Sequence, residues 1–294
     1  MPPNRGHIET ERIHAQTQAL DLLSTLECVD VLAKDHEQAI DAVQNASVEI
    51  AHFLDALVPR ILDGGRLIYA GCGTSGRLGV LDAAECPPTF QSPPELVIGL
   101  IAGGDASLRT SSEAKEDNPN GIAPEFDRID LNANDTVLGI AAGGTTPWVL
   151  GGLNIAKERG AMTGFLTCSD VQPIVDHLIY LNSGPEPLTG STRLKAGTAT
   201  KLTLNIITTT LFIKLGKVYG NLMVDLKASN EKLLDRAIRI VSTVCEVKRE
   251  VSSEILSASG GDVKIAIVMH KKSTDYNTAK DLLSDVGEDL RKIL

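Results

Sequence analysis

Short, continuously apolar runs alternate with longer segments of helical periodicity through the first two thirds of the chain, and this alternation constrains the fold more than any other feature. The runs lie at residues 66–73, 95–104, 135–144, 161–168 and 177–184. A strand that is apolar on both faces is typical of a parallel sheet covered by helices on each side. The chain is therefore predicted to form an α/β domain of three layers, a parallel sheet flanked by helices.

Three segments of helical character lie beside these runs. Residues 37–62 repeat apolar side chains at intervals of three and four, and the sequence DGG that follows ends the pattern. Residues 146–160 have Pro147 near a helix start and Gly160 at the end. Residues 196–218 are largely apolar and predict a buried helix, although their threonines lower the intrinsic helix propensity.

The last part of the chain has a different pattern. Residues 231–256 and 278–294 look helical, and the run KIAIVM at residues 264–269 suits either a strand or the core of a helix. No series of strands continues beyond about residue 230. We therefore predict a first domain at residues 1–234, which includes a helical N-terminal arm, and a small helical C-terminal domain at residues 235–294.

Composition excludes several classes of partner. The chain has 28 Lys and Arg against 38 Asp and Glu, so its net charge is −10, whereas nucleic-acid binding needs a clustered basic surface. Aromatic residues make up only 3% of the chain, which disfavours base stacking. No apolar run reaches the ~20 residues that cross a bilayer, and the N-terminus lacks the apolar core of a signal peptide. We expect neither a nucleic-acid nor a membrane partner.

Cysteine usage indicates the compartment. The five cysteines are scattered, form no CxxC pair and are odd in number. This pattern indicates reduced thiols and a cytoplasmic chain rather than a disulfide framework. The sequence shows no His, Cys, Asp or Glu cluster with the spacing of metal ligands. Neither a metal nor another cofactor is therefore expected.

The sequence LIYAGCGTSGRLG at residues 67–79 joins an apolar strand to a helix through a glycine-rich turn. Backbone amides at such a turn, together with the helix N-terminus, bind anions, and Thr74 and Ser75 add hydroxyl groups. A P-loop would need GK[ST], but the chain has Ser75-Gly76-Arg77. The spacing GxGxxG is present without the acidic residue that a dinucleotide site requires about 20 residues later. A tight turn without a ligand remains the alternative for this motif alone.

Two further loops favour a ligand site. The sequence AAGGTTP at residues 141–147 again joins a strand to a helix, and TGSTRLKAGTATK at residues 189–201 precedes the long buried helix. Loops at the carboxyl ends of parallel strands converge on one crevice. Hydroxyls and amides with few cations suit a phosphomonoester on a neutral polyol. The predicted phosphate-binding residues are Gly73, Thr74, Ser75, Gly143, Gly144, Thr145 and Thr146, and the third loop adds Ser191, Arg193 and Lys195 as substrate-binding residues.

The block GCGTSGRLGVLDAAECPPTF closely resembles the signature of N-acetylmuramic acid 6-phosphate etherases, which are sugar isomerase (SIS) domain proteins. The blocks GLIAGG, TGSTRLKAGTATKLTLN and GKVYGNLMVDLKASNEKL resemble further family blocks in the same order, and the resemblance covers roughly residues 20–234. The glucokinase regulatory protein shares these blocks, but it is longer and is not an etherase. The resemblance implies a SIS-type fold, a sugar 6-phosphate substrate and a homodimer with sites near the subunit boundary.

The resemblance also implies a reaction and two catalytic residues. The family cleaves the C3 lactyl ether of N-acetylmuramic acid 6-phosphate by elimination and water addition, which gives N-acetylglucosamine 6-phosphate and D-lactate. The family's two catalytic glutamates match Glu85 in AAECPP and Glu116 in SSEAKEDN, with Glu113 as the nearest competitor of Glu116. We expect desolvation to raise the pKa of Glu85 and suit it to an acid role, while Lys115 keeps Glu116 ionised as a base. The two roles could be exchanged.

The chain departs from the family pattern at two places. Gly143 and Thr145 stand where the family typically has Ser and Arg, and Ile13 and His14 stand where its N-terminal segment has Arg and Asn. His14 is expected to be a surface histidine. These departures keep two alternatives open, a non-catalytic sugar-phosphate sensor and a sugar-phosphate isomerase. Release of D-lactate would distinguish an etherase from both.

Overall fold

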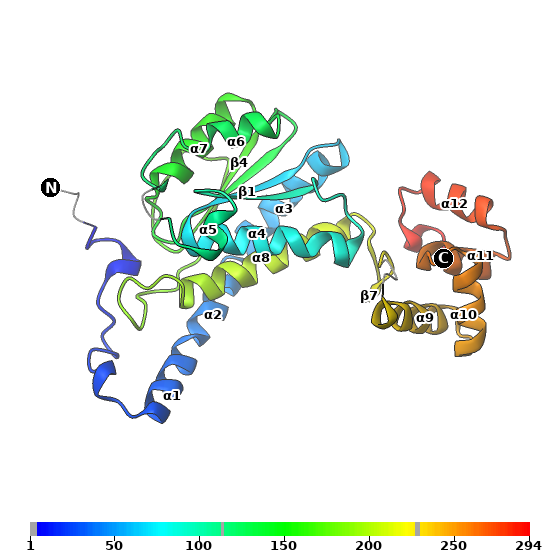
Figure 1. The fold of residues 1–294 in the computed structure, drawn as a ribbon, viewed down its shortest axis with the longest axis horizontal. Helices are drawn as coiled ribbons and strands as arrows, with labels where there is room; N and C mark the ends of the chain where they lie inside the picture. Colours follow the sequence, from blue (N-terminus) through cyan, green and yellow to red (C-terminus); the bar gives the residue numbers. More distant parts are fainter. Residues whose placement is uncertain (1–4, 113–114, 227–229) are drawn as a thin grey trace. The chain divides into compact units, whose positions relative to one another are not determined.

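The computed structural model describes residues 5–112, 115–226 and 230–294 (Figure 1). Contacts within the chain divide it into two units, the first formed by residues up to Ala84 and Glu95–Ile207, the second by Glu85–Pro94 and Thr208–Leu294. This division lies upstream of the expected boundary at residue 234, because Val224 and Leu226 are buried in the hydrophobic core of the helical unit. None of the described helices is long and apolar enough to span a membrane.

The first unit is built on a five-stranded parallel sheet with the strand order β2-β1-β3-β4-β5. The strands are β1 Leu67–Gly71, β2 Val97–Ile101, β3 Thr136–Ile140, β4 Met162–Thr167 and β5 His177–Tyr180. Leu67 pairs with Val97 on one side and with Thr136 on the other. From β1 the chain adds β2 on one side of the sheet, and it then adds β3, β4 and β5 on the other side. This reversal creates a switch point between β1 and β3.

Helices cover both faces of this sheet, so the predicted three-layer α/β fold is confirmed. On one face, α6 (Ala123–Arg128) and α7 (Pro147–Glu158) bury a core that joins Trp148 to Ile68 and Phe165. The opposite face is covered by α3 (Ser47–Leu62) and α4 (Gly73–Phe90) (Figure 1). Two glycines, Gly79 and Gly164, allow a helix to pack closely against a strand on this face, because they carry no side chain. A Cβ on Gly79 would lie 3.0 Å from Tyr69, and one on Gly164 would lie 2.8 Å from the Phe53 ring.

The N-terminal elements precede the sheet. They are the 3-10 turns η1 Glu9–Glu11 and η2 Leu20–Leu22 and the helices α1 Thr25–Asp35 and α2 Glu37–Asn45. A capping box starts α1, because the Ser24 hydroxyl accepts from the Glu27 amide and the Glu27 carboxylate accepts from the Ser24 amide. The single helix expected at residues 37–62 is two helices, α2 and α3, separated at Ala46. The Ser47 hydroxyl donates to the Gln44 carbonyl at 2.5 Å and competes with helical hydrogen bonding there.

The second unit is mainly helical. Its elements after α8 (Lys195–Lys214) are the hairpin β6 Val218–Tyr219 and β7 Leu222–Met223, the helices α9 Glu231–Cys245, α10 Arg249–Ala258, α11 Val263–Lys272 and α12 Tyr276–Asp285, and the turn η4 Leu290–Lys292. The run KIAIVM lies inside α11, so it is helical. Its Lys264 is buried and donates to Asp225 at 2.8 Å and to the Glu288 carbonyl at 2.6 Å.

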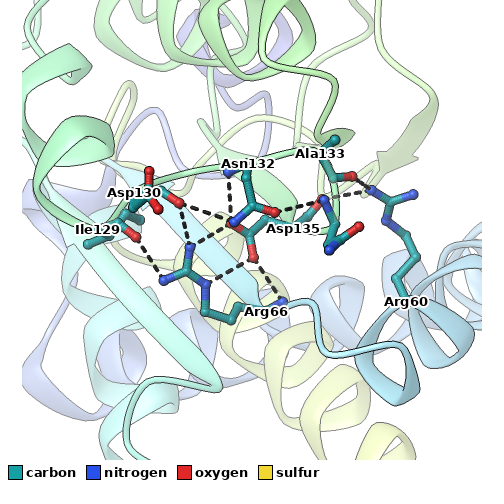
Figure 2. A network of polar contacts seen from close by, with 8 residues as sticks. Arg60, Arg66, Ile129, Asp130, Asn132, Ala133 and Asp135 are labelled. Carbon is teal, nitrogen blue, oxygen red and sulfur yellow. Dashed lines mark hydrogen bonds and ion pairs between the residues drawn. The ribbon is translucent and has the colours of Figure 1, made fainter.

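A polar network joins β1 to β3 at the amino end of the sheet (Figure 2). Asp135, which is 1% exposed, accepts from the Arg66 side chain at 2.9 and 2.6 Å and from the Arg66 amide at 3.1 Å. The amide of Asn132 donates to the same carboxylate at 3.1 Å. Arg66 also donates to the Ile129 carbonyl. This network holds the two strands that flank the switch point in register at the end opposite the glycine-rich loops.

Candidate functional site

The loop after β1 is a tight turn into α4. A Cβ on Gly71 would lie 2.7 Å from the Gly76 nitrogen, and one on Gly76 would lie 2.6 Å from the Gly71 carbonyl oxygen. Gly73 has a φ of +52°, a conformation that favours glycine. Thr74 and Ser75, both half-buried, follow in the first turn of α4. The glycines therefore permit the turn that brings backbone amides and two hydroxyl-bearing residues to the carboxyl end of β1.

The loop after β3 lies on the other side of the switch point. Gly144 has a φ of +74°, and a Cβ there would lie 2.7 Å from Val171. Thr145 and Thr146 are half-buried, and the Thr146 side chain makes no capping hydrogen bond to α7. Because β1 and β3 are adjacent parallel strands, their carboxyl-end loops are neighbours. The structure therefore brings two of the three predicted loops together.

The third predicted segment lies beside the first loop, but its residues differ in setting. A Cβ on Gly197, in the first turn of α8, would lie 3.5 Å from the Thr74 methyl group. Ser191 is half-buried and Arg193 is exposed. Lys195 is fully buried, with its ammonium 3.0 Å from an Asp35 oxygen and 2.7 Å from the Gln38 oxygen. The structure therefore places the Lys195 ammonium in an internal ion pair, and its predicted role in substrate binding stays a prediction.

A buried carboxylate occupies the N-terminus of α8. Glu186 is 0% exposed and accepts from the amides of Lys195 at 2.9 Å and Ala196 at 3.0 Å. Burial raises the pKa of Glu186, and the two amide hydrogen bonds oppose that rise. The position in which this helix terminus could hold an anion is thus filled by the chain itself.

Glu116 lies in a small pocket at the carboxyl edge of the sheet. The pocket has a volume of about 40 Å³ and is lined by Cys72, Gly73, Arg77, Ala102, Ser107, Ser111, Ser112 and Glu116. The Glu116 carbonyl accepts a hydrogen bond of 2.9 Å from the Trp148 amide at the start of α7. This bond ties Glu116 to the helix that follows the second loop, while its pocket includes Gly73 of the first. Glu116 is thus positioned beside both loops at the switch point.

The hydroxyl-rich side of this pocket was missed by the sequence interpretation. The Ser107 and Ser112 hydroxyls hydrogen-bond to each other, and Ser112 also donates to the Ala102 carbonyl at 3.4 Å. Arg77 donates through Nε to the Leu108 carbonyl at 3.1 Å. The signal was present, because residues 107–112 read SLRTSS shortly after the apolar run at residues 95–104. The rule that identified the other loops would have identified this one.

Cys72 shares the pocket, but its thiol is unsuited to nucleophilic chemistry. Burial, with a smaller contribution from the Glu116 charge, raises the pKa of Cys72 to about 12. A thiol needs its thiolate form to attack, and that form is scarce near neutral pH at such a pKa. Cys72 is therefore a packing residue.

Two expectations about titratable residues are wrong. Glu85 is exposed on α4, so the desolvated setting expected for it is absent in the single chain. His14 is 8% exposed, and its Nε2 lies 3.0 Å from Asp35, so it is not a surface histidine. Glu113 lies outside the described residues. Within the described ranges, no three His, Cys, Asp or Glu side chains gather as metal ligands would.

Comparisons with known proteins agree with this architecture. Residues 49–157 match the model of the glucokinase regulatory protein N-terminal SIS domain, and residues 220–280 match the C-terminal lid domain of that protein. A phosphoheptose isomerase from Francisella tularensis has a similar fold, with a TM-score of 0.52 at 18% identity over 65% of this chain and 100% of its own.

Curated relatives are similar over nearly the whole chain. An N-acetylmuramic acid 6-phosphate etherase of Crocosphaera subtropica is 48% identical over 99% of this chain and 96% of its own length. Another, of Thermosynechococcus vestitus, is 51% identical over 91% of this chain and 88% of its own. With two glycine-rich loops at the switch point of a SIS-type sheet and this identity, the chain belongs to the N-acetylmuramic acid 6-phosphate etherase family.

Proposed function

We propose that the protein cleaves the C3 lactyl ether of N-acetylmuramic acid 6-phosphate, which yields N-acetylglucosamine 6-phosphate and D-lactate. The observation that supports this most strongly is the 48% identity to a named etherase across 99% of the chain. The enzyme is therefore a carbon–oxygen lyase of amino-sugar metabolism. The fold supports this proposal, because two glycine-rich turns lie next to the carboxylate of Glu116 at one edge of the sheet.

The loops after β1 and β3 are the proposed anchor for the sugar 6-phosphate. Backbone amides around Gly73 and Gly144 and the N-termini of α4 and α7 supply partial positive charge. The hydroxyls of Thr74, Ser75 and Thr145 add donors. Held in this way, the phosphate at C6 would leave the ring carbons over the pocket that contains Glu116.

Glu116 is the proposed base that acts at C2. Ring opening places the C1 aldehyde beside C2, so the C2 proton becomes acidic. Glu116 takes that proton, the C3–O bond breaks with its electron pair on the lactyl oxygen, and a protonated carboxyl group neutralises the leaving lactate. Water then adds to C3 of the unsaturated aldehyde. Glu85 is the proposed proton donor, on the strength of its match to the family's second glutamate.

The surface of α1 supports the proposal of a homodimer. None of the side chains of α1 is buried within the chain, and Leu26 and Val29 are 70% and 58% exposed. Leu22, in the turn η2 that precedes α1, is 80% exposed. A helix of this length is marginal in water unless an apolar face is covered. We propose that a second copy of the chain covers this face of α1.

We also propose that the protein works in the cytoplasm, because its five unpaired cysteines suit a reducing compartment.

A double substitution tests the homodimer. The unmodified protein should have twice its chain mass of 31.3 kDa in sedimentation equilibrium, and Leu26→Asp with Val29→Asp should reduce it to the single-chain mass, because buried carboxylates oppose association. Ile174→Asp is the matched control, since Ile174 is 81% exposed in the loop between β4 and β5, and it should leave the dimer intact. A single-chain mass for the unmodified protein would exclude the homodimer.

Turnover in heavy-oxygen water tests the reaction. Incubation with N-acetylmuramic acid 6-phosphate in H₂¹⁸O should release D-lactate and place ¹⁸O on C3 of the sugar product, measured by fragmentation mass spectrometry. Label in the lactate instead would contradict elimination followed by hydration. An isomerised sugar without lactate would favour an isomerase, and thermal stabilisation by the sugar without turnover would favour a sensor.

A further inference from the structure

The N-terminal arm, defined as residues 8–17, packs against the carboxyl-end loops of the first unit. The Thr17 hydroxyl donates to the Pro187 carbonyl at 2.8 Å. The hydroxyl of Tyr180, at the end of β5, donates to the carboxylate of Glu9. A Cβ on Gly190 would lie 3.2 Å from a Glu11 carboxylate oxygen. The arm is therefore fixed by contacts at several points along the edge of the sheet that holds the proposed phosphate site.

One polar group of this arm lacks the partner that its burial requires. Thr10 is 0% exposed, and its Oγ1 has no hydrogen-bond partner in the part of the chain that the structure describes. A buried hydroxyl that makes no hydrogen bond is costly, because it has lost its bonds to water without replacement. Valine has nearly the same shape and would avoid this cost. A partner from outside the chain would explain why the hydroxyl is there.

The unpaired hydroxyl lies next to the second loop. A Cβ on Gly143 would lie 3.8 Å from Thr10 Oγ1, with no other described atom within 4 Å apart from its own chain neighbours. Gly143 is half-buried, and its backbone is outside the left-handed region that favours glycine. Glycine at this position thus leaves a gap between the loop and the Thr10 hydroxyl, although the backbone would accept a side chain.

We propose that Thr10 is a ligand-binding residue of the phosphate site, and that its hydroxyl donates to a phosphate oxygen that enters the gap at Gly143. This inference rests on the proposed function, because it assumes a sugar phosphate at the loop after β3. A hydroxyl that donates to an anionic oxygen makes a charge-assisted hydrogen bond, which is stronger than a neutral one. The arm then contributes directly to binding and does not serve only as packing.

Binding of N-acetylglucosamine 6-phosphate, measured by isothermal titration calorimetry, tests the proposal in the full chain. Thr10→Val should weaken binding about 10-fold, while the melting temperature without ligand stays the same or rises. Thr10→Ser retains the hydroxyl and should bind within threefold of the unmodified protein. Thr17→Val is the matched control in the same arm. It removes a hydroxyl that is already paired, so it should lower the melting temperature and change affinity less than twofold.

A second substitution tests the position of the gap. Gly143→Ala fills the gap beside Thr10 with a methyl group, so it should weaken binding at least threefold in the otherwise unmodified protein. Unchanged binding by Gly143→Ala, or unchanged binding by Thr10→Val, would overturn the proposal. A loss of affinity in Thr10→Val that comes with the same fall in melting temperature as Thr17→Val would also overturn it. If the unmodified protein does not bind N-acetylglucosamine 6-phosphate, the proposed function itself fails and this inference fails with it.

Discussion

Glu116→Gln should lower kcat for N-acetylmuramic acid 6-phosphate by at least about 100-fold, the usual effect of removing a general base. Glutamine matches glutamate in size but cannot take a proton from C2. The pocket should survive the change, because the Glu116 carbonyl, which accepts from the Trp148 amide at 2.9 Å, is backbone. Release of D-lactate measures kcat, and circular dichroism checks that the variant is folded.

A control substitution and a proton-exchange measurement complete the test of Glu116 as the base and Glu85 as the acid. Glu125→Gln changes a half-buried glutamate of the same unit, which pairs with Arg128, and it should leave kcat within twofold. Exchange of the C2 proton in D₂O separates base from acid. Glu116→Gln should abolish exchange, whereas Glu85→Gln should retain it while lactate release is lost. If Glu116→Gln turns over within threefold of the unmodified protein, Glu116 is not the base; if the exchange results are reversed, the two glutamates have the opposite roles.

The sheet could be predicted because its strands are apolar on both faces. Val137 and Leu138 are adjacent in sequence, point to opposite faces of β3, and are both 0% exposed. That pattern depends only on local sequence. The loops after β1 and β3 could be predicted for a related reason, since a positive φ, such as those at Gly73 and Gly144, favours glycine.

The settings of the charged residues could not be predicted, because they depend on segments far apart in the chain. Lys195 is buried, and its ammonium pairs with Asp35, which lies 160 residues away in sequence. His14 contacts the same carboxylate from the N-terminal arm. Glu85 has apolar neighbours in sequence, but on a helix these point in different directions and leave the glutamate exposed. The residues next to a position in sequence therefore predict well whether it lies in a strand, but they predict poorly which groups surround a side chain on a helix.

Asp135→Ala should destabilise the first unit by about 3 kcal/mol, the lower end of the cost of breaking a buried ion pair. The lower end applies because the Arg66 side chain is 21% exposed and can be hydrated once its partner is lost. The substitution also leaves the amides of Arg66 and Asn132 without the carboxylate that accepts from them (Figure 2). Asp135→Asn retains one acceptor oxygen and the shape of the side chain, so its effect should be smaller.

Urea unfolding, followed by tryptophan fluorescence, measures the loss of stability of the first unit that Asp135→Ala should cause. Trp148 is the single tryptophan and is 2% exposed in the core of the first unit, so its signal reports that unit without a contribution from the second. Asp127→Ala is the matched control. It breaks a pair with Arg159 in which Asp127 is 68% exposed, and an exposed pair contributes at most about 1 kcal/mol. A loss for Asp135→Ala no larger than that for Asp127→Ala would mean that strand register at the switch point does not depend on this network.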